Sequence, residues 1–218
     1  MRRKLGIVAG LVEGRGLANP RRRPSSGVAA QMALRQGVGT GKVRAMEGSF
    51  LPMADGDSFI PGPATERRFR DALGLFATGV TVVTTRGARG PVGITANSFA
   101  SLSLDPPLVL WSPARASRRF AAFASAQHYA IHVLGEEQFA LGRHFAREGL
   151  DFDLPGVACN PEGVPLLTEC LARFECRRHA VHDGGDHAIV VGEVLRAAAR
   201  EGTPLVFSAG HYGRFTPR

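Results

Sequence analysis

Small and polar residues gather in segment 93–99, Gly-Ile-Thr-Ala-Asn-Ser-Phe, although the residues around it predict a strand. Glycine and alanine, here including Ala96, let a flat ligand approach the backbone closely. The side chains of Thr95, Asn97 and Ser98 can donate and accept hydrogen bonds along the edge of a heterocycle. The segment predicts a binding site for such a ligand; the competing interpretation is an ordinary polar strand end.

A second polar group lies between a predicted strand and a predicted helix start. It consists of Ser112, Arg115, Ser117 and Arg118. Free backbone N–H groups at a helix N-terminus, joined by hydroxyls and guanidiniums, suit a phosphate. A solvated loop is the competing interpretation. Because both segments should lie at the ends of adjacent strands, their joint presence favours one shared ligand.

Residues 182–187, His-Asp-Gly-Gly-Asp-His, form the third group. Glycines and aspartates between two strand-like runs predict a hairpin turn. The two histidines, together with His179, raise the question of a metal site. Histidine ligands on a strand favour i, i+2 spacing, and the pattern offers no fourth ligand, so we reject a metal. A purely structural polar turn stays open as an alternative.

A mainly β fold must position these groups. Apolar and β-branched runs predict strands at 80–85, 92–101, 108–111, 129–134, 171–181, 188–195 and 205–207. Helices are predicted from residue 66, from Ser117 and over 136–146, and residues 151–165 are predicted to be loop. Six or seven strands with a few short helices, and no regular βαβ alternation, predict a β-barrel with helical decoration. A Rossmann fold is disfavoured, since the sequence has no Gly-x-Gly-x-x-Gly.

Residues 1–60 do not resemble a folded domain, because their apolar residues follow neither a helical nor a strand period. They carry ten Lys and Arg against four Asp and Glu, so most of the formal charge of +8 lies here. The alternatives are a disordered basic arm, a targeting peptide, and upstream sequence translated from a misassigned start. We favour the last, with Met46 or Met53 as initiator. The folded domain then spans residues 61–218.

Composition excludes several classes of protein. From residue 61 onward every basic residue other than histidine is arginine, which indicates GC-rich coding DNA rather than a nucleic-acid surface. No apolar run approaches the ~18 residues of a membrane span. Three cysteines cannot all pair and form no Cys-x-x-Cys, as is typical of a reducing cytoplasm. We therefore expect a cytoplasmic protein that binds neither nucleic acid nor a membrane.

From about Phe69 to Phe215 the chain resembles the short-chain NAD(P)H:flavin oxidoreductases, which supply reduced flavin to two-component monooxygenases. Residues 77–84, Ala-Thr-Gly-Val-Thr-Val-Val-Thr, look like the family's opening strand. Residues 93–110 are similar to its flavin-site signature, and 132–146 fit its next strand and helix. The sequence Gly185-Asp186-His187 resembles the Gly-Asp-His of its nicotinamide nucleotide site. Residues 1–60 have no counterpart in the family.

The resemblance implies an FMN-binding split β-barrel with a Greek-key core, assembled as a homodimer. It implies non-covalent FMN or FAD near the dimer interface, with NADH or NADPH as hydride donor. Carried over residue by residue, the isoalloxazine and ribityl chain would be held by Thr95, Ala96, Asn97 and Ser98. The flavin phosphate would lie by Ser112, Ser117, Arg118 and Arg115, and Phe145 would pack beside the flavin. The nicotinamide nucleotide would lie by Gly185, Asp186, His187, His182 and Tyr212, with His187 as the catalytic candidate.

The function that the resemblance implies is reduction of free flavin for a partner monooxygenase. No Ser-His-Asp or Cys-His pattern suggests a protein nucleophile, and the cofactors themselves can carry a hydride transfer. One alternative is a flavin carrier or oxidase on the same barrel without a nicotinamide site. A remote alternative is a nucleic-acid-binding protein that acts through residues 1–60.

Overall fold

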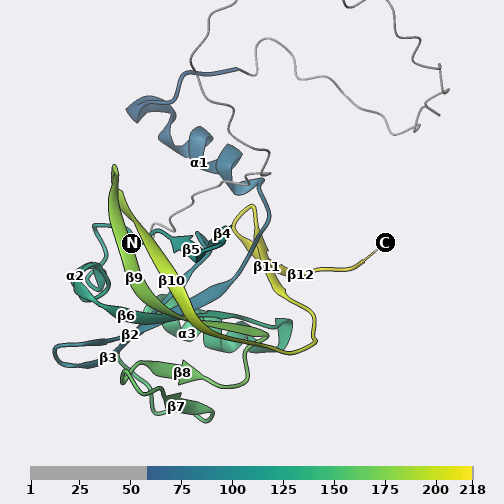
Figure 1. The fold of residues 1–218 in the computed structure, drawn as a ribbon. Coiled ribbons are helices and arrows are strands. Elements are labelled where there is room, and N and C mark those ends of the chain that lie inside the picture. Colours follow the sequence, from purple (N-terminus) through teal and green to yellow (C-terminus); the bar gives the residue numbers. More distant parts are fainter. Residues whose placement is uncertain (1–57, 218) are drawn as a thin grey trace, which may run out of the picture. The chain divides into compact units, whose positions relative to one another are not determined.

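A computed structural model describes residues 58–217, and antiparallel strands dominate this part of the chain (Figure 1). The predicted mainly β fold is confirmed. The largest sheet has seven strands in the order β3 (Gly90–Ala96), β2 (Thr81–Gly87), β6 (His128–Val133), β9 (Ala172–Gly184), β10 (His187–Ala199), β5 (Pro107–Trp111) and β4 (Ala100–Leu104). The sheet is not closed, because β3 and β4 are its two edges. The long β9–β10 hairpin separates β5 from β6, which are neighbours in sequence.

Shorter elements surround this sheet. A three-stranded sheet contains β1 (Thr78–Gly79), β11 (Leu205–Ser208) and β12 (His211–Arg214), and a two-stranded one contains β7 (Val157–Cys159) and β8 (Pro165–Leu167). The helices are α1 (Glu66–Gly74), α2 (Phe120–Ser125) and α3 (Phe139–Arg147), with 3-10 turns η2 (Pro63–Thr65) and η3 (Glu136–Gln138). No helix in residues 58–217 is long and apolar enough to cross a membrane.

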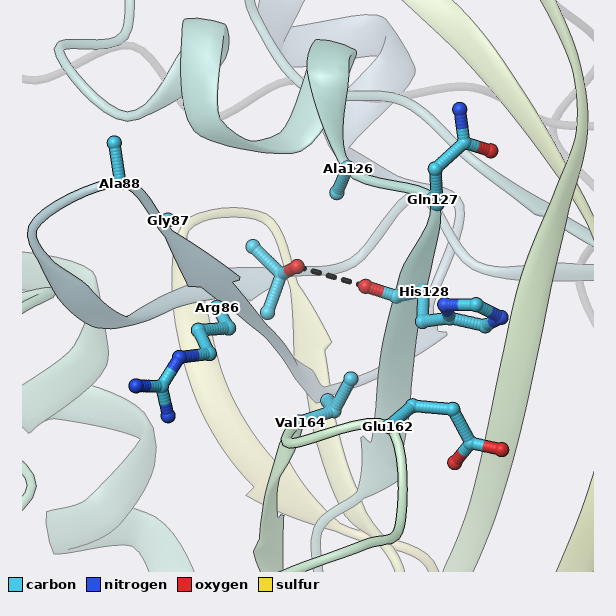
Figure 2. Close-up of a pocket in the computed structure, with 9 residues that line it drawn as sticks. Arg86, Gly87, Ala88, Ala126, Gln127, His128, Glu162 and Val164 are labelled. Atoms are coloured by element: carbon cyan, nitrogen blue, oxygen red, sulfur yellow. Dashed lines mark hydrogen bonds between the residues drawn. The ribbon is translucent and has the colours of Figure 1, made fainter.

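Strand β2 forms because Thr81 to Thr85 are all β-branched and buried. The strand pairs with β3 on one side and β6 on the other. Near its end, the Thr85 hydroxyl donates a hydrogen bond of 2.8 Å to the backbone oxygen of His128 (Figure 2). A surface hollow of about 360 Å³ opens there, lined also by Arg86, Gln127 and Glu162.

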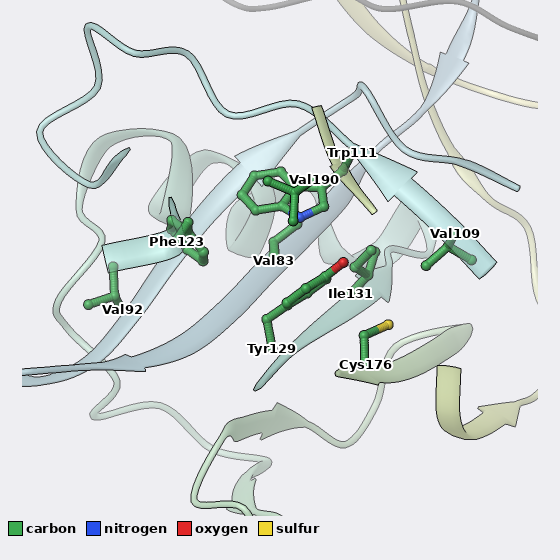
Figure 3. Close-up of a cluster of buried hydrophobic side chains, with 9 residues drawn as sticks. All are labelled: Val83, Val92, Val109, Trp111, Phe123, Tyr129, Ile131, Cys176 and Val190. Carbon is green, nitrogen blue, oxygen red and sulfur yellow. The ribbon is translucent and has the colours of Figure 1, made fainter. Parts of the chain in front are cut away.

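The core lies on both faces of β2, because successive side chains of a strand point to opposite sides. Val83 belongs to a cluster of buried hydrophobic side chains from the main sheet and α2. In this cluster Trp111 packs edge-on against Phe123, with ring centroids 5.1 Å apart (Figure 3). Val82 joins a second cluster that contains Phe145 of α3 and Leu205 of β11. Because neighbouring side chains of β2 pack into these two clusters, this strand connects α3 and the three-stranded sheet to the main sheet.

The structure corrects three sequence predictions. The predicted strand 92–101 is broken at residues 97–99 into β3 and β4, because buried Ser98 uses its hydroxyl to bond the end of β5. The predicted loop 151–165 contains β7 and leads into β8, whose three residues are all buried. The chain also forms β12 after the predicted last strand. The predictions for residues 1–57 lie outside the described residues.

Candidate functional site

Residues 95–98 contain the last two residues of β3 and the two that follow, so their polar groups lie at one end of this strand. The Thr95 hydroxyl donates a 2.6 Å hydrogen bond to the backbone oxygen of Gly142, which attaches β3 to α3. Ala96 pairs with Thr81 and packs against the main core. Asn97 is only 6% exposed, and its Oδ1 has no hydrogen-bond partner. A buried polar atom without a partner is unusual in a folded protein and requires an explanation.

Ser98 joins this segment to the end of β5. Its hydroxyl accepts a hydrogen bond from the backbone N–H of Ser112 at 2.9 Å and donates to the Ser112 backbone oxygen at 3.2 Å. The hydroxyl of Ser112 itself is buried without a partner. The structure thus brings together two segments that the sequence separates by 14 residues, and each contributes an unsatisfied polar atom.

Arg115 connects the loop after β5 to the turn of the β9–β10 hairpin. Its backbone N–H donates to the Asp186 oxygen at 2.9 Å, and its Nε donates to the Gly185 oxygen at 3.1 Å. Its guanidinium also forms an ion pair of 2.6 Å with Asp183. These contacts orient the Arg115 side chain toward the turn, whereas the resemblance implied a position near a flavin phosphate.

The hairpin turn is tighter than the four residues expected. Gly184 pairs with His187, which leaves Gly185 and Asp186 as a two-residue turn. Gly185 has a φ of +73° while Asp186 does not have a positive φ, the pattern of a type II′ turn. His187 follows at once and forms a β-bridge with Ala114. The turn therefore lies against the loop that starts at Ser112.

The imidazole of His187 is oriented by its neighbour. Its Nδ1 lies 2.7 Å from the carboxylate of Asp186, and the side chain is only 12% exposed. Because a carboxylate accepts hydrogen bonds, Nδ1 carries the proton of this pair. The opposite nitrogen, Nε2, is buried without a partner. The ring therefore has one bonded nitrogen and one buried nitrogen without a partner.

The remaining predicted residues have different surroundings. Phe145 is fully buried against Phe152, and a Cβ added at Gly93 would lie 2.5 Å from its ring. Tyr212 packs against Phe139 and Phe207, and burial raises its pKa above the usual value. The other three residues are Ser117, Arg118 and His182. The Ser117 hydroxyl accepts a hydrogen bond of 3.2 Å from the Arg119 backbone N–H. The side chains of Arg118 and His182 are exposed.

Arg119 was missed by the sequence analysis. Its Nη1 donates to the backbone oxygens of Gly93 at 2.9 Å and Phe145 at 2.6 Å, and its Nη2 donates to Ala146 at 3.4 Å. The only signal was the Arg118-Arg119 pair after a predicted helix cap. Sequence alone did not tell which arginine faces solvent and which turns inward.

Neither of two surface hollows in the described residues contains a predicted site residue. One is the hollow beside Thr85, and the other, of about 590 Å³, lies along α3 between Phe139 and Glu148. The candidate site is instead made by residues 95–98, 112–119 and 185–187, which hydrogen bonds bring together. Among residues 58–217, five buried side-chain polar atoms lack a partner; three of them belong to Asn97, Ser112 and His187, and the other two to Trp111 and Tyr129.

Comparison with known proteins assigns most of the described residues to one type of domain. The family described as flavin reductase like domain matches residues 73–216. The NADH-dependent FMN reductase SmoA of Agrobacterium fabrum is 57% identical over 166 residues, which cover 76% of this chain and 95% of that protein. The reductase subunit HsaB of a flavin-dependent monooxygenase from Rhodococcus jostii is 41% identical, over 74% and 85% of the two chains.

Solved structures show the same similarity. The NADH:FAD oxidoreductase SgcE6 of Streptomyces globisporus aligns with a TM-score of 0.67 and 37% identity, over 74% of this chain and 94% of that one. The same oxidoreductase has been solved with NAD and FAD fragments, and that structure aligns with a TM-score of 0.66 and 38% identity, over 73% and 98%.

Proposed function

Because the chain belongs to the flavin reductase like family, we propose that it is an NADH-dependent flavin reductase that releases reduced flavin for a partner monooxygenase. The resemblance found in the sequence motifs is thereby confirmed at the level of the family. FMN and FAD are both candidate substrates, since relatives are named for each. NADH is favoured over NADPH because the named relatives use NADH.

The observation that carries the proposal is the group of three unsatisfied polar atoms. Asn97 Oδ1, Ser112 Oγ and His187 Nε2 are all buried and all lack a hydrogen-bond partner. Leaving such an atom unpaired costs about 1–3 kcal/mol, so a folded protein rarely keeps one without a use. An amide oxygen and a hydroxyl fit the hydrogen-bonding edge of a flavin, and an imidazole fits a nicotinamide nucleotide.

In this proposal, bound flavin and nicotinamide together supply hydride chemistry, and the protein supplies binding and orientation. Thr95 to Ser98 bind the flavin ring and its ribityl chain, and backbone N–H groups there stabilise negative charge at the ring edge. Ser117 and Arg118 bind the phosphate. Phe145 supports β3 from the side of α3, since it is fully buried behind Gly93.

The nicotinamide side is held by the β9–β10 turn. Asp186 fixes the ring of His187 through Nδ1, and Nε2 then faces the nucleotide. Arg115 holds the turn against the flavin half of the site through Gly185 and Asp183. Holding two reactants at a fixed separation is the main contribution a protein makes to such a transfer. His182 and Tyr212 are weaker candidates for the same nucleotide.

A flavin-dependent monooxygenase is the proposed partner, reached by diffusing reduced flavin. Relatives named as reductase components of such enzymes support this. A homodimer is the proposed assembly, because the edge strand β4 directly follows the flavin segment and exposes Leu102 and Leu104, 45% and 96%. A second copy over this edge would bury both side chains and lie next to the flavin segment.

The deciding experiment is a steady-state assay of the purified chain with NADH or NADPH and each flavin in turn. We expect loss of the reduced nicotinamide absorbance only when flavin is present, and faster with NADH. A protein that binds flavin but oxidises neither nucleotide would support the alternative, a flavin carrier or oxidase. Absence of flavin binding altogether would contradict both.

A further inference from the structure

We propose that Arg119 is a positioning residue, which fixes the phosphate-binding loop relative to the strand that binds the flavin ring. This inference rests on the proposed function and adds a residue to it. A flavin nucleotide has its ring at one end and its phosphate at the other. The two protein segments that bind those ends must therefore be held at a constant separation.

The side chain of Arg119 spans this separation. The residue follows Ser117 and Arg118 directly in the chain, and its backbone N–H donates to the Ser117 hydroxyl. Its guanidinium reaches the backbone oxygen of Gly93, two residues before Thr95, at 2.9 Å. One residue thus bonds the phosphate loop through its backbone and the ring-binding strand through its side chain.

The same guanidinium also caps the end of α3. It donates to the backbone oxygens of Phe145 at 2.6 Å and Ala146 at 3.4 Å. Carbonyls at a helix C-terminus lack partners within the helix, and they carry partial negative charge that a cation stabilises. Arg119 therefore holds α3 in place, and α3 in turn holds β3 through Gly142 and Thr95.

The surroundings of Arg119 leave little room for another arrangement. The Gly93 N–H donates to the Gly149 oxygen at 2.7 Å, which brings the chain after α3 against β3. A Cβ added at Gly149 would lie 2.4 Å from the Arg119 side chain and 2.7 Å from the Gly93 oxygen. Gly149 thus passes over the stem of Arg119, and the planar guanidinium with its fixed fork of donors matches three carbonyls at once.

A positioning role makes a selective prediction. If Arg119 holds the phosphate loop in register, its loss should weaken binding of FMN, which carries the phosphate. Riboflavin has the same ring and ribityl chain without the phosphate, so its binding should change little. A merely structural role would lower stability and weaken both ligands alike.

The test compares dissociation constants for FMN and riboflavin, by fluorescence titration, in wild type, Arg119→Met and Arg119→Lys. Arg178→Met is the matched control, because Arg178 also donates to a helix-terminal carbonyl, that of Ala124 at 2.7 Å, outside the site. We expect Arg119→Met to reduce the preference for FMN about tenfold, the size of one charge-assisted hydrogen bond. Arg119→Lys should recover part of the preference, and Arg178→Met should keep it while lowering the melting temperature.

An unchanged preference in Arg119→Met, or equal affinities for both ligands in wild type, would overturn the inference and leave the proposed function standing. Equal losses of both ligands in Arg119→Met and Arg119→Lys would overturn it too, as a structural role. Failure of the wild type to bind either flavin would instead overturn the proposed function, and this inference with it.

Discussion

At the scale of single residues, His187 is defined by its two ring nitrogens. One is bonded to Asp186, and the other is buried without a partner. A histidine that merely opened a strand would have no reason to leave a buried nitrogen unpaired, since such an atom costs stability. Its position beside Ala114 places that nitrogen near the loop assigned to the flavin.

Replacing His187 by alanine should impair use of NADH far more than flavin binding. Loss of a ligand contact of about 1–3 kcal/mol lowers kcat/KM for the nucleotide by roughly 5- to 150-fold. Flavin affinity and melting temperature should stay near their wild-type values. His179→Ala is the matched control, because His179 is exposed on strand β9 of the same hairpin. Nucleotide kinetics within twofold of wild type would remove His187 from the site.

Ser112→Ala should have opposite effects on the stability of the free protein and of the flavin-bound protein. The Ser112 hydroxyl is buried without a partner, so its removal relieves a desolvation cost and leaves the free protein as stable or slightly more stable. With flavin present the same change removes a contact, and the flavin-induced rise in melting temperature should shrink. Ser98→Ala should instead lower stability in both states, because Ser98 bonds the Ser112 backbone. Equal destabilisation of free and bound protein by Ser112→Ala would contradict a ligand role.

At the scale of elements, local chemistry and tertiary contacts decide different features. The run of β-branched residues in β2 was sufficient to predict that strand, and its burial explains why. The break at residues 97–99 was not predictable, because it depends on a hydrogen bond from Ser98 to a residue 14 positions away. The small strand β8 was missed because Pro165 to Leu167 form too short a run to show a period, and its strand conformation depends on pairing with β7 and packing against β2 and β6.

The candidate site shows the same division. The residue types of segment 95–98 and of the Gly-Asp-His turn were enough to nominate them. Their proximity depends on the insertion of the β9–β10 hairpin beside β5, which no local pattern encodes. The bonds from Arg115 to the turn also depend on that arrangement, whereas those from Arg119 depend on the packing of α3 against β3. Sequence therefore assigned Arg115 to the phosphate and missed Arg119.

His132 connects three strands and makes their association sensitive to acid. Its Nδ1 donates to the Val82 oxygen at 3.0 Å, and its Nε2 accepts the Leu167 N–H at 3.1 Å. The pKa of His132 is lowered to about 4, because burial outweighs the opposing effect of its hydrogen bond to Val82; nearby Arg173 also lowers this pKa and Glu175 raises it. A proton on Nε2 would face the Leu167 N–H, so the folded state requires the neutral ring.

Stability should therefore fall as the pH drops from about 6.5, the usual pKa of the unfolded chain, toward 4. The folded pKa is the lower one, so the contribution of His132 is complete above pH 6.5 and is lost on acidification. Between pH 6.5 and 4 the contribution of His132 to the free energy of unfolding amounts to about 3 kcal/mol, at 1.36 kcal/mol per pH unit. Urea unfolding at several pH values should give a flatter profile for His132→Gln, with the exposed His179→Gln as control. Parallel profiles for His132→Gln and wild type would contradict this role.

At the scale of the whole molecule, residues 1–52 should be dispensable. The family match begins at residue 73, and those residues show no helical or strand period in their apolar positions. A chain that starts at Met53 should keep the melting temperature, flavin affinity and NADH oxidation of the full chain. DNA binding that weakens with salt and disappears on this truncation would instead favour the basic-arm alternative. A large loss of stability or activity would show that the segment belongs to the folded domain.

The proposed homodimer makes the final prediction, which concerns the edge strand β4. An edge strand presents unpaired backbone groups and attracts another chain unless it is blunted by charge. Strand β4 has no charged residue, and the side chain of Leu104 is 96% exposed. Since β4 begins two residues after Ser98, a copy that covers β4 would also lie next to the flavin segment. Leu104→Glu should therefore yield a monomer, as measured by light scattering, and should bind flavin more weakly. Its melting temperature without flavin is compared with that of the wild type, as a control for folding. Leu150→Glu, at an exposed leucine in the loop after α3, should leave both properties unchanged. A wild-type monomer that binds flavin tightly, or a Leu104→Glu dimer, would contradict this surface as the interface.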